Sequence, residues 1–300
     1  MQSILNYIQH PASFCDSLVH HYCQWLPDSV YIKLRYLFNT GKRLNLKKTT
    51  TFSEKMQWLK LHDRNPEYTK MVDKILVKDY VAGIIGSEHV IPLLGVWNKP
   101  EDIDWDMLPN QFVLKTNHSG GSTGVVICKN KAAFDTKSAI VKLNKSLKSD
   151  VYRSFREWPY KNVERKVFAE KYIEPDLNKK DLPDYKFFCF NGEPKYCQVI
   201  SGRETIMSID FFDNNWNHLP FHEPKSYPFA KSEPQKPKCF ERMWEMARLL
   251  AHGKPFSRID FYQVRDHVLF GEITLYPTSG MGGFDPEEWD YKLGELIKIE

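Results

Sequence analysis

One segment near residue 190 constrains the fold more than any other part of the chain. Residues 185–190 and 195–200 are rich in aromatic and apolar side chains, and Asn191-Gly192 stands between them. Asn and Gly tolerate the positive φ angles that a tight hairpin turn requires, and aromatic side chains favour strands. We therefore expect an antiparallel hairpin here, which excludes an all-helical fold.

The segments on both sides of this hairpin add more strands. Residues 112–115 and 124–127 flank a Gly/Ser loop and are expected to form a second hairpin, with a helix over residues 132–147 and a strand over 167–173 after it. Further strands are expected at residues 208–212, 257–261 and 268–275, with a helix over 240–250. The last two strands surround a polar turn. The C-terminal part therefore reads as mostly antiparallel sheet.

The first 85 residues have a helical pattern instead, because apolar residues recur at steps of three and four. Thr51 or Ser53 is placed to cap a helix that runs to residue 61, and a second helix is expected over residues 68–85. Pro92 then opens a short strand. Helices first and antiparallel strands later predict an α+β fold. Residues 1–48 are expected to pack as a helical preface; the alternative is a helix on the membrane surface, which would permit peripheral membrane association.

Composition narrows the class of protein. A chain of 300 residues with 42% hydrophobic residues can bury a core, and a net charge of +4 is too small and dispersed to indicate nucleic-acid binding. The six scattered cysteines form no C-x-x-C pair, so we expect reduced thiols. The most apolar stretch, residues 84–97, is interrupted by Gly86 and Pro92, and the N-terminus does not read as a secretory signal. We expect a cytoplasmic protein without a transmembrane segment.

Two motifs could carry chemistry. Lys115 at the end of a strand precedes a loop that contains Ser119, Gly120, Gly121 and Ser122. Backbone N–H groups of such a loop and a nearby lysine suit phosphate binding, although a Gly/Ser hairpin tip is often only solvated. The loop is not a Walker A motif, which needs G-x-x-x-x-G-K-[ST] before a helix.

The second motif is a pair of carboxylates on neighbouring strands. Asp260 and Glu272 are 12 positions apart in the last expected hairpin, a spacing that permits both to face one side, and Arg258 shares the face of Asp260. Such a pair suits Mg²⁺ shared with nucleotide phosphates. A buried structural ion pair is the alternative.

The ordered series of motifs resembles the ATP-grasp superfamily and, more specifically, the TupA-like ATP-grasp family, named for teichuronopeptide biosynthesis. The strings that carry the resemblance are Phe52-Ser53-Glu54-Lys55-Met56-Gln57-Trp58-Leu59, Lys115-Thr116-Asn117-His118-Ser119-Gly120-Gly121, Arg258-Ile259-Asp260-Phe261-Tyr262 and Phe270-Gly271-Glu272-Ile273-Thr274-Leu275-Tyr276-Pro277. The resemblance implies an ATP-grasp fold, in which two α+β lobes sandwich ATP. We expect a helical N-terminal region at 1–99, one lobe at 100–172 and the other at 173–300.

The resemblance also implies roles for single residues. Lys74 and Lys115 are similar to the two nucleotide-binding lysines, and the loop of Ser119, Gly120, Gly121 and Ser122 to the phosphate lid. Glu170, Lys171, Tyr172 and Ile173 are similar to the hinge that binds adenine and ribose, and Lys186, Arg203 and Arg258 to catalytic positions. Asp260, Glu272 and Thr274 occupy the places of the Mg²⁺ ligands. Thr274 is a departure, because Asn is common there and a hydroxyl is a weaker ligand.

The implied activity is an ADP-forming amide ligase that activates a carboxylate as an acylphosphate. Its partners would be ATP, a carboxylate-bearing sugar or glycan precursor, and an amino acid or other amine, in bacterial surface polysaccharide biosynthesis such as capsule or O-antigen. Two alternatives stay open. Asp102-Ile103-Asp104 is a D-x-D string of the kind that serves glycosyltransferases using nucleotide sugars, and a non-catalytic nucleotide- or glycan-binding module would also fit.

Overall fold

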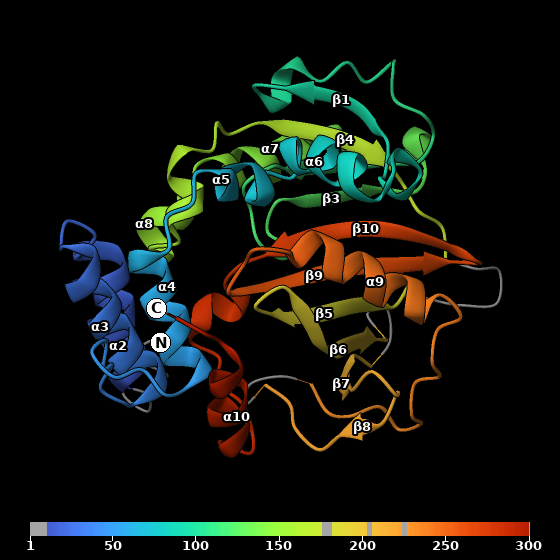
Figure 1. The fold of residues 1–300 in the computed structure, drawn as a ribbon. Helices are drawn as coiled ribbons and strands as arrows, with labels where there is room; N and C mark the ends of the chain where they lie inside the picture. The colour runs from blue at the N-terminus through green and yellow to red at the C-terminus, as the bar shows by residue number, and fades with distance from the viewer. Residues whose placement is uncertain (1–10, 176–181, 203–205, 224–226, 300) are drawn as a thin grey trace.

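The computed structural model describes residues 11–175, 182–202, 206–223 and 227–299. Its strands form two antiparallel sheets, which Figure 1 shows one above the other. The small sheet has the order β1-β4-β2-β3 and the large sheet the order β10-β9-β5-β6-β7-β8. The strands are β1 Leu93–Trp97, β2 Phe112–Thr116, β3 Val125–Cys128, β4 Val167–Lys171, β5 Asp184–Phe190, β6 Glu193–Ser201, β7 Ser208–Phe212, β8 His218–Leu219, β9 Phe256–Val264 and β10 His267–Thr274. The predicted α+β fold is confirmed.

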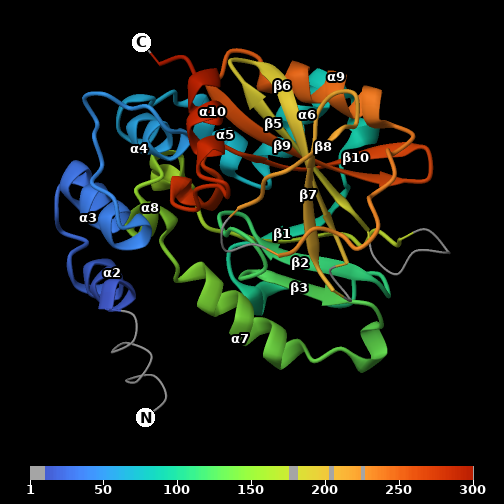
Figure 2. The same cartoon turned by 90° about the horizontal axis from the view of Figure 1, so that it is seen from below.

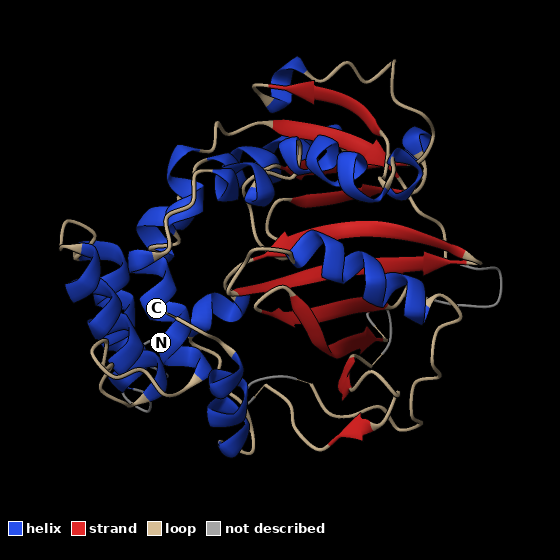
Figure 3. Cartoon of the chain, in the orientation of Figure 1, coloured by secondary structure: helices blue, strands red, loops and turns tan. Residues whose placement is uncertain are grey.

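Helices lie against both sheets, and a further group of helices stands to one side of them (Figure 3). The α-helices are α2 Pro11–Tyr22, α3 Asp28–Thr40, α4 Phe52–His62, α5 Glu67–Val72, α6 Leu76–Ile85, α7 Thr136–Leu147, α8 Val151–Phe155, α9 Phe240–Ala251 and α10 Glu288–Leu296. Single turns of 3₁₀ helix are η1 Ser87–His89, η2 Pro100–Asp102, η3 Lys131–Ala133, η4 Trp158–Asn162 and η5 Pro277–Gly280. No helix in the described ranges is both long and apolar enough to pass through a bilayer.

The three predicted hairpins are present, the last of them formed by β9 and β10. Strands β5 and β6 pair from Phe190 opposite Glu193 outward, and Asn191 and Gly192 have φ angles of 49° and 87° in their turn. Strands β2 and β3 pair with Phe112 opposite Cys128. The turn chemistry of Asn-Gly therefore determined the local fold, as its tolerance of positive φ predicts.

The large sheet has one apolar and one mixed face, because side chains alternate along each strand. Phe187, Ile259 and Phe261 are fully buried on the face that α9 covers, where the ring of Phe187 contacts that of Phe240. The opposite face faces the small sheet. Side chains on that second face are free to carry function, because the core on the α9 side anchors the strands.

The small sheet has a smaller core of its own. Helix α7 packs against β2 and β3 and contributes Leu143 to a cluster with Phe112, Leu114 and Val167. Figure 2 shows α7 running along this sheet. Strand β1, residues 93–97, pairs with β4 and so joins the sheet that residues 112–171 form.

The single helix expected over residues 68–85 is wrong, because the chain forms α5 and α6 with a break at residues 73–75. The Asp73 carboxylate accepts hydrogen bonds from the N–H groups of Ile75 (2.8 Å) and Leu76 (3.3 Å), which competes with helical bonding. The N–H of Lys74 instead donates to the carbonyl of Asn117 at 3.0 Å. Apolar periodicity continues across such a short break and therefore conceals it.

Two further boundaries differ from expectation. The helix expected from residue 132 begins at Thr136, where Asp135 caps it by accepting from the N–H of Ser138. The strand expected over 167–173 ends at Lys171. The N-cap of α4 is Thr51, and Glu54 completes a reciprocal capping box with it.

Candidate functional site

A row of charged side chains lies on the face of the large sheet that faces the small sheet. Lys186 of β5 is opposite Asp260 of β9, and Asp260 is opposite Glu272 of β10. Two residues further along β9 and β10, Arg258 is opposite Thr274. Three adjacent strands therefore bring five of the predicted site residues together.

A β-bulge at Gly271 places Glu272 in this row. The hairpin turn places Val264 opposite His267, and that register carried on unchanged would put Gly271 opposite Asp260. The bulge shifts the register by one residue, so Glu272 takes that place. A one-residue shift moves a side chain to the other face of a sheet, so the bulge aims the Glu272 carboxylate into the site.

Arg258 connects the two carboxylates. Its guanidinium donates to both oxygens of Asp260, with Nε to Oδ1 at 2.7 Å and Nη2 to Oδ2 at 2.8 Å. Nη2 also donates to Glu272 Oε1 and to Thr274 Oγ1, both at 3.0 Å. Lys186 pairs with Asp260 from the other side. Each carboxylate thus has a cationic partner within the site.

Lys74 approaches this row from the break between α5 and α6. Its Nζ lies 3.3 Å from Glu272 Oε2. Burial opposes ionisation of Glu272, but Lys74, Lys186 and Arg258 outweigh burial and hold the pKa of its carboxyl well below the ordinary value. Glu272 is therefore ionised at neutral pH, and its side chain keeps 31% of its surface exposed.

The donor chemistry of the row suits a magnesium ion. Asp260 and Glu272 offer carboxylate oxygens from opposed positions, and Mg²⁺ is normally bound by one or two carboxylates together with substrate phosphates. No group of three or more His, Cys, Asp or Glu side chains in the described part of the chain could hold a metal by itself.

On the small sheet a single carboxylate, that of Glu170, sits between two lysines. Lys115 pairs with Oε1, and Lys78 Nζ lies 3.0 Å from Oε2 and donates to the carbonyl of Ile91 at 2.7 Å. Burial would raise the pKa of Glu170, but Lys115 and Lys78 hold it below the ordinary value.

The Gly/Ser loop follows β2 and is fixed at both ends. Asn117 donates to Asp73 Oδ2 and to the carbonyl of Glu164, both at 2.8 Å, so it ties the loop to the α5–α6 break. Gly124 closes the loop where a Cβ atom would overlap the hydroxyls of Thr116, Ser119 and Ser146. Between these points residues 120–123 are exposed, while Ser119 is buried. The arrangement leaves the backbone of the loop tip accessible.

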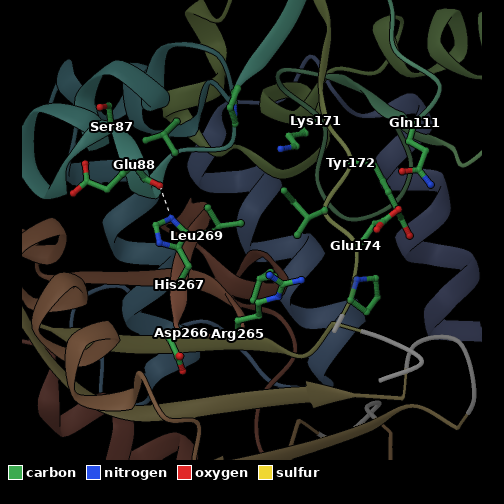
Figure 4. A pocket seen from close by; sticks show the side chains of 15 residues that line it. Ser87, Glu88, Gln111, Lys171, Tyr172, Glu174, Arg265, Asp266, His267 and Leu269 are labelled. Atoms are coloured by element: carbon green, nitrogen blue, oxygen red, sulfur yellow. Dashed lines mark hydrogen bonds between the residues drawn. The ribbon is translucent and has the colours of Figure 1, made fainter. Parts of the chain in front are cut away.

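A cavity of about 890 Å³ lies beside the hinge (Figure 4). Lys171, Tyr172 and Ile173 line one wall, and Leu269 of β10 lines another. His267 at the rim hydrogen-bonds the carbonyl of Glu88 at 2.7 Å. Glu170 does not line the cavity, because its carboxylate points to the lysines.

The turn after β10 has an unusual backbone. Thr278 and Ser279 have φ angles of 46° and 55°, a left-handed conformation that non-glycine residues seldom adopt. Helix α4 holds this turn, because the buried Lys60 ammonium donates to the carbonyl and hydroxyl of Ser279, both at 2.7 Å, and Gln57 donates to the carbonyl of Gly280 at 2.8 Å. Backbone strain of this kind is found where the surroundings impose it, often at functional sites.

The predicted residues that the structure describes fall into four groups. Lys186, Arg258, Asp260, Glu272, Thr274 and Lys74 form one contact network, Lys115 and Glu170 a second, and Lys171, Tyr172 and Ile173 line the cavity. Ser119, Gly120, Gly121 and Ser122 belong to the loop. Arg203 lies outside the described residues. Sequence reasoning missed Lys78, Asp73 and Asn117; the signal for Lys78 was a lysine amid the apolar positions of a helix.

The D-x-D string lies in an exposed turn. Asp104 accepts hydrogen bonds from the N–H groups of Asp106 and Met107, and Asp102 ends η2. Both aspartates are exposed. An exposed turn of this kind is solvated, and it gives no support to the glycosyltransferase alternative.

Comparisons with known proteins give a consistent result. A family model described as TupA-like ATP-grasp matches residues 54–298. A search of curated proteins finds no match.

Among solved structures, the chain is similar to a D-alanine–D-alanine ligase from Bacillus anthracis at 19% identity and TM-score 0.43, covering 76% of this chain and 66% of that one. The same ligase complexed with ATP gives 18% identity and TM-score 0.41, with 76% and 63% covered. A D-alanyl-alanine synthetase A from Vibrio cholerae O1 gives 14% identity and TM-score 0.45, with 81% and 68% covered. The chain thus spans about two thirds of the length of these ligases.

Proposed function

The chain belongs to the TupA-like ATP-grasp family and has the ATP-grasp fold, and from this premise we propose that it is an ADP-forming ligase that joins a carboxylate to an amine. One observation carries the proposal. The Lys74 side chain contacts Glu272 on the large sheet, while its backbone N–H donates to Asn117 beside the Gly/Ser loop. Cations, carboxylates and a phosphate-type loop therefore converge between the two sheets.

ATP would lie between the sheets with its base at the hinge. The cavity beside Lys171, Tyr172 and Ile173 has the size and the apolar wall at Leu269 that an adenine ring needs. The loop of Ser119, Gly120, Gly121 and Ser122 would bind phosphate oxygens through backbone N–H groups, and Lys74 and Lys115 would neutralise their charge. Glu170 would hold Lys115 in place for this. On this proposal the lobes are residues 100–172 and 173–300, after a helical region at 1–99, with β1 added to the first sheet.

Asp260, Glu272 and Thr274 would hold Mg²⁺, which supplies charge neutralisation at the phosphates. The ionised state of Glu272 supports this role. Arg258 and Lys186 now neutralise the two carboxylates, so the row stays charge-balanced before the nucleotide arrives.

The reaction would proceed in two displacements. The substrate carboxylate attacks the γ-phosphorus of ATP; an O–P bond forms, the bond to the β-phosphate oxygen breaks, and ADP leaves. The amine then attacks the acylphosphate carbon, forms a C–N bond, expels phosphate and loses a proton to water. Phosphoryl transfer needs positioning and charge stabilisation more than a covalent protein group, and Arg258 and Lys186, with Arg203, would supply that charge.

The acceptor we propose is a uronic-acid carboxylate of a bacterial surface polysaccharide precursor, and the amine an amino acid. The family match supports this choice. No nucleic-acid partner is proposed.

The test is product analysis with purified protein, Mg-ATP, glucuronic or galacturonic acid derivatives and a panel of amino acids. ADP and phosphate should be released in a carboxylate-dependent manner, and mass spectrometry should find the acceptor heavier by one amino acid minus water. An Asp260→Asn variant serves as the inactive control. Release of AMP, or ADP release that ignores every carboxylate offered, would contradict the proposal.

A further inference from the structure

The chain that leaves β10 crosses the site face of the large sheet to the opposite edge. After Thr274 it passes through η5 and reaches Asp285, whose backbone pairs with that of His222 next to β8. The N–H of His222 donates to the carbonyl of Asp285 at 3.0 Å, and the reverse bond is 2.8 Å. The crossing segment, residues 275–285, therefore covers part of the sheet between β10 and β8.

A second cavity of about 310 Å³ lies between this segment and the sheet. Thr278, Met281 and Gly282 of the crossing segment line it, together with Ile209 of β7 and the Glu223 carboxyl. Since a water molecule takes about 30 Å³ of liquid, the cavity has room for about ten waters. That is the scale of one amino acid or another small molecule, and it is too small for a nucleotide.

The position of this cavity follows from the order of residues along β10 and the η5 turn after it. Leu269 lines the hinge cavity, Glu272 and Thr274 belong to the charged row, and Thr278 lines the second cavity. The charged row thus lies between the two cavities. If the base of the nucleotide occupies the first, its terminal phosphate points toward the second.

The charge of the second cavity identifies the kind of ligand. Glu223 is its carboxylate, and no described residue gives that carboxylate a hydrogen bond or ion pair. Burial raises the pKa of Glu223, while the more distant Arg258 and Lys186 lower it in part. A half-buried carboxylate without a partner among the described residues is complementary to an ammonium group with its N–H donors. It disfavours an anionic ligand that has no ammonium group, for the same reason.

We propose that the cavity between Ile209, Glu223 and Thr278 is the subsite for the amine substrate, a small primary amine whose ammonium group the Glu223 carboxylate binds. The inference rests on the proposed function for its place in the reaction. It assigns the amine to the side of the charged row away from the hinge. The carboxylate substrate then approaches from the cationic side, at Arg258 and Lys186.

Isothermal titration of the full chain with Mg-ADP present tests this binding without turnover. The probes are glycine, L-alanine, L-glutamate, L-lysine and ethanolamine, each beside its N-acetylated counterpart, which lacks the ammonium charge. We expect at least one amine to bind, its N-acetyl form to bind at least about tenfold more weakly, and Glu223→Gln to lose about tenfold or more for the amine. Glu223→Asp keeps the negative charge, so it should bind the amine more tightly than Glu223→Gln does and more weakly than the wild type.

The matched control is Glu245→Gln, an exposed carboxylate on α9 that pairs with Arg248, which should bind as the wild type does. Thermal melting of each variant checks folding. Equal affinity of the wild type and Glu223→Gln, or absence of binding by every amine in the panel, overturns the proposal. The outcome is separate from that of the proposed function, because AMP release in the turnover assay would reject the ligase chemistry without changing the amine affinities measured here.

Discussion

The two sheets each place acidic side chains among cations, but they do so in different ways. On the small sheet Glu170 has 6% of its side chain exposed, and both of its oxygens are held by lysines. On the large sheet Glu272 has 31% exposed and shares Arg258 with Asp260. A buried carboxylate with a lysine on each oxygen holds those lysines in place. A more exposed carboxylate that shares its arginine with a second carboxylate is able to exchange that cation for another ligand. On the proposed function, Glu170 is a positioning carboxylate and Glu272 a ligand-binding one.

The largest effect expected from this comparison is on turnover at the large sheet. Asp260→Asn and Glu272→Gln keep side-chain shape but remove the negative charge, so each should lower kcat by at least about 10²-fold. The measurement is ADP release, with circular dichroism to show that both variants fold. If either variant keeps most of its activity, that carboxylate is not a metal ligand.

The next effect concerns stability at the small sheet. Glu170→Gln removes one partner from a buried ion network and leaves Lys78 and Lys115 unpaired, so it should lower the free energy of unfolding by about 3 kcal/mol at pH 7. Denaturant titration measures this. Gln at the exposed Glu174 serves as the control and should change little.

The same variant gives a test by pH. The pKa of Glu170 is lowered in the folded protein, so its stabilising effect is fully present above the ordinary carboxyl pKa and is lost as pH falls through the folded value. The stability difference between wild type and Glu170→Gln should therefore be constant from pH 7 to about pH 5 and shrink below about pH 4. A difference that stays constant in acid would mean that the pairs with Lys78 and Lys115 do not stabilise the fold.

A smaller effect is expected at the Gly/Ser loop. A Cβ at Gly124 overlaps three hydroxyls, so Gly124→Ala should displace the loop, cost about 1–3 kcal/mol locally and raise KM for ATP. Gly120→Ala is the matched control, because no atom lies within 4 Å of a Cβ there. Steady-state kinetics compares the two. Equal KM values for both variants would show that the loop geometry does not matter for the nucleotide.

The smallest effect is expected at Thr274, where Asn is common in the superfamily. Thr274→Asn should be tolerated or mildly activating, because an amide oxygen is a better ligand than a hydroxyl and can still accept the hydrogen bond from Arg258. The measurement is kcat at saturating and limiting Mg²⁺. Complete loss of turnover would show that Thr274 has a role of its own.

The sequence predicted what local patterns encode. The Asn191-Gly192 turn, the N-cap at Thr51, which was one of two candidates, and the alternation of β9 each depend on neighbours a few residues away, and each was found. The order of motifs was enough to predict the family. These features need no knowledge of tertiary structure.

The remaining features depend on contacts between distant segments. The break at Lys74 is fixed by a bond to Asn117, and the bulge at Gly271 depends on the register of a whole hairpin. Lys78 reads as an ordinary helical lysine until Glu170 is placed beside it. Glu223 could not be singled out, because the cavity exists only after the crossing segment returns over the sheet.

The contact between α4 and the turn after β10 has a consequence for how the protein is made on the ribosome. Lys60 and Ser279, which it joins, are 219 residues apart. Synthesis adds about 5–20 residues per second, so Lys60 leaves the ribosome well before its partner exists. The strands of the small sheet come from one continuous stretch, residues 93–171, and can pair during that interval, whereas β5 must wait for β9. Nascent chains released before residue 256, where β9 begins, should therefore contain a formed Gly/Ser loop but no assembled row of carboxylates, and they should need protection from aggregation.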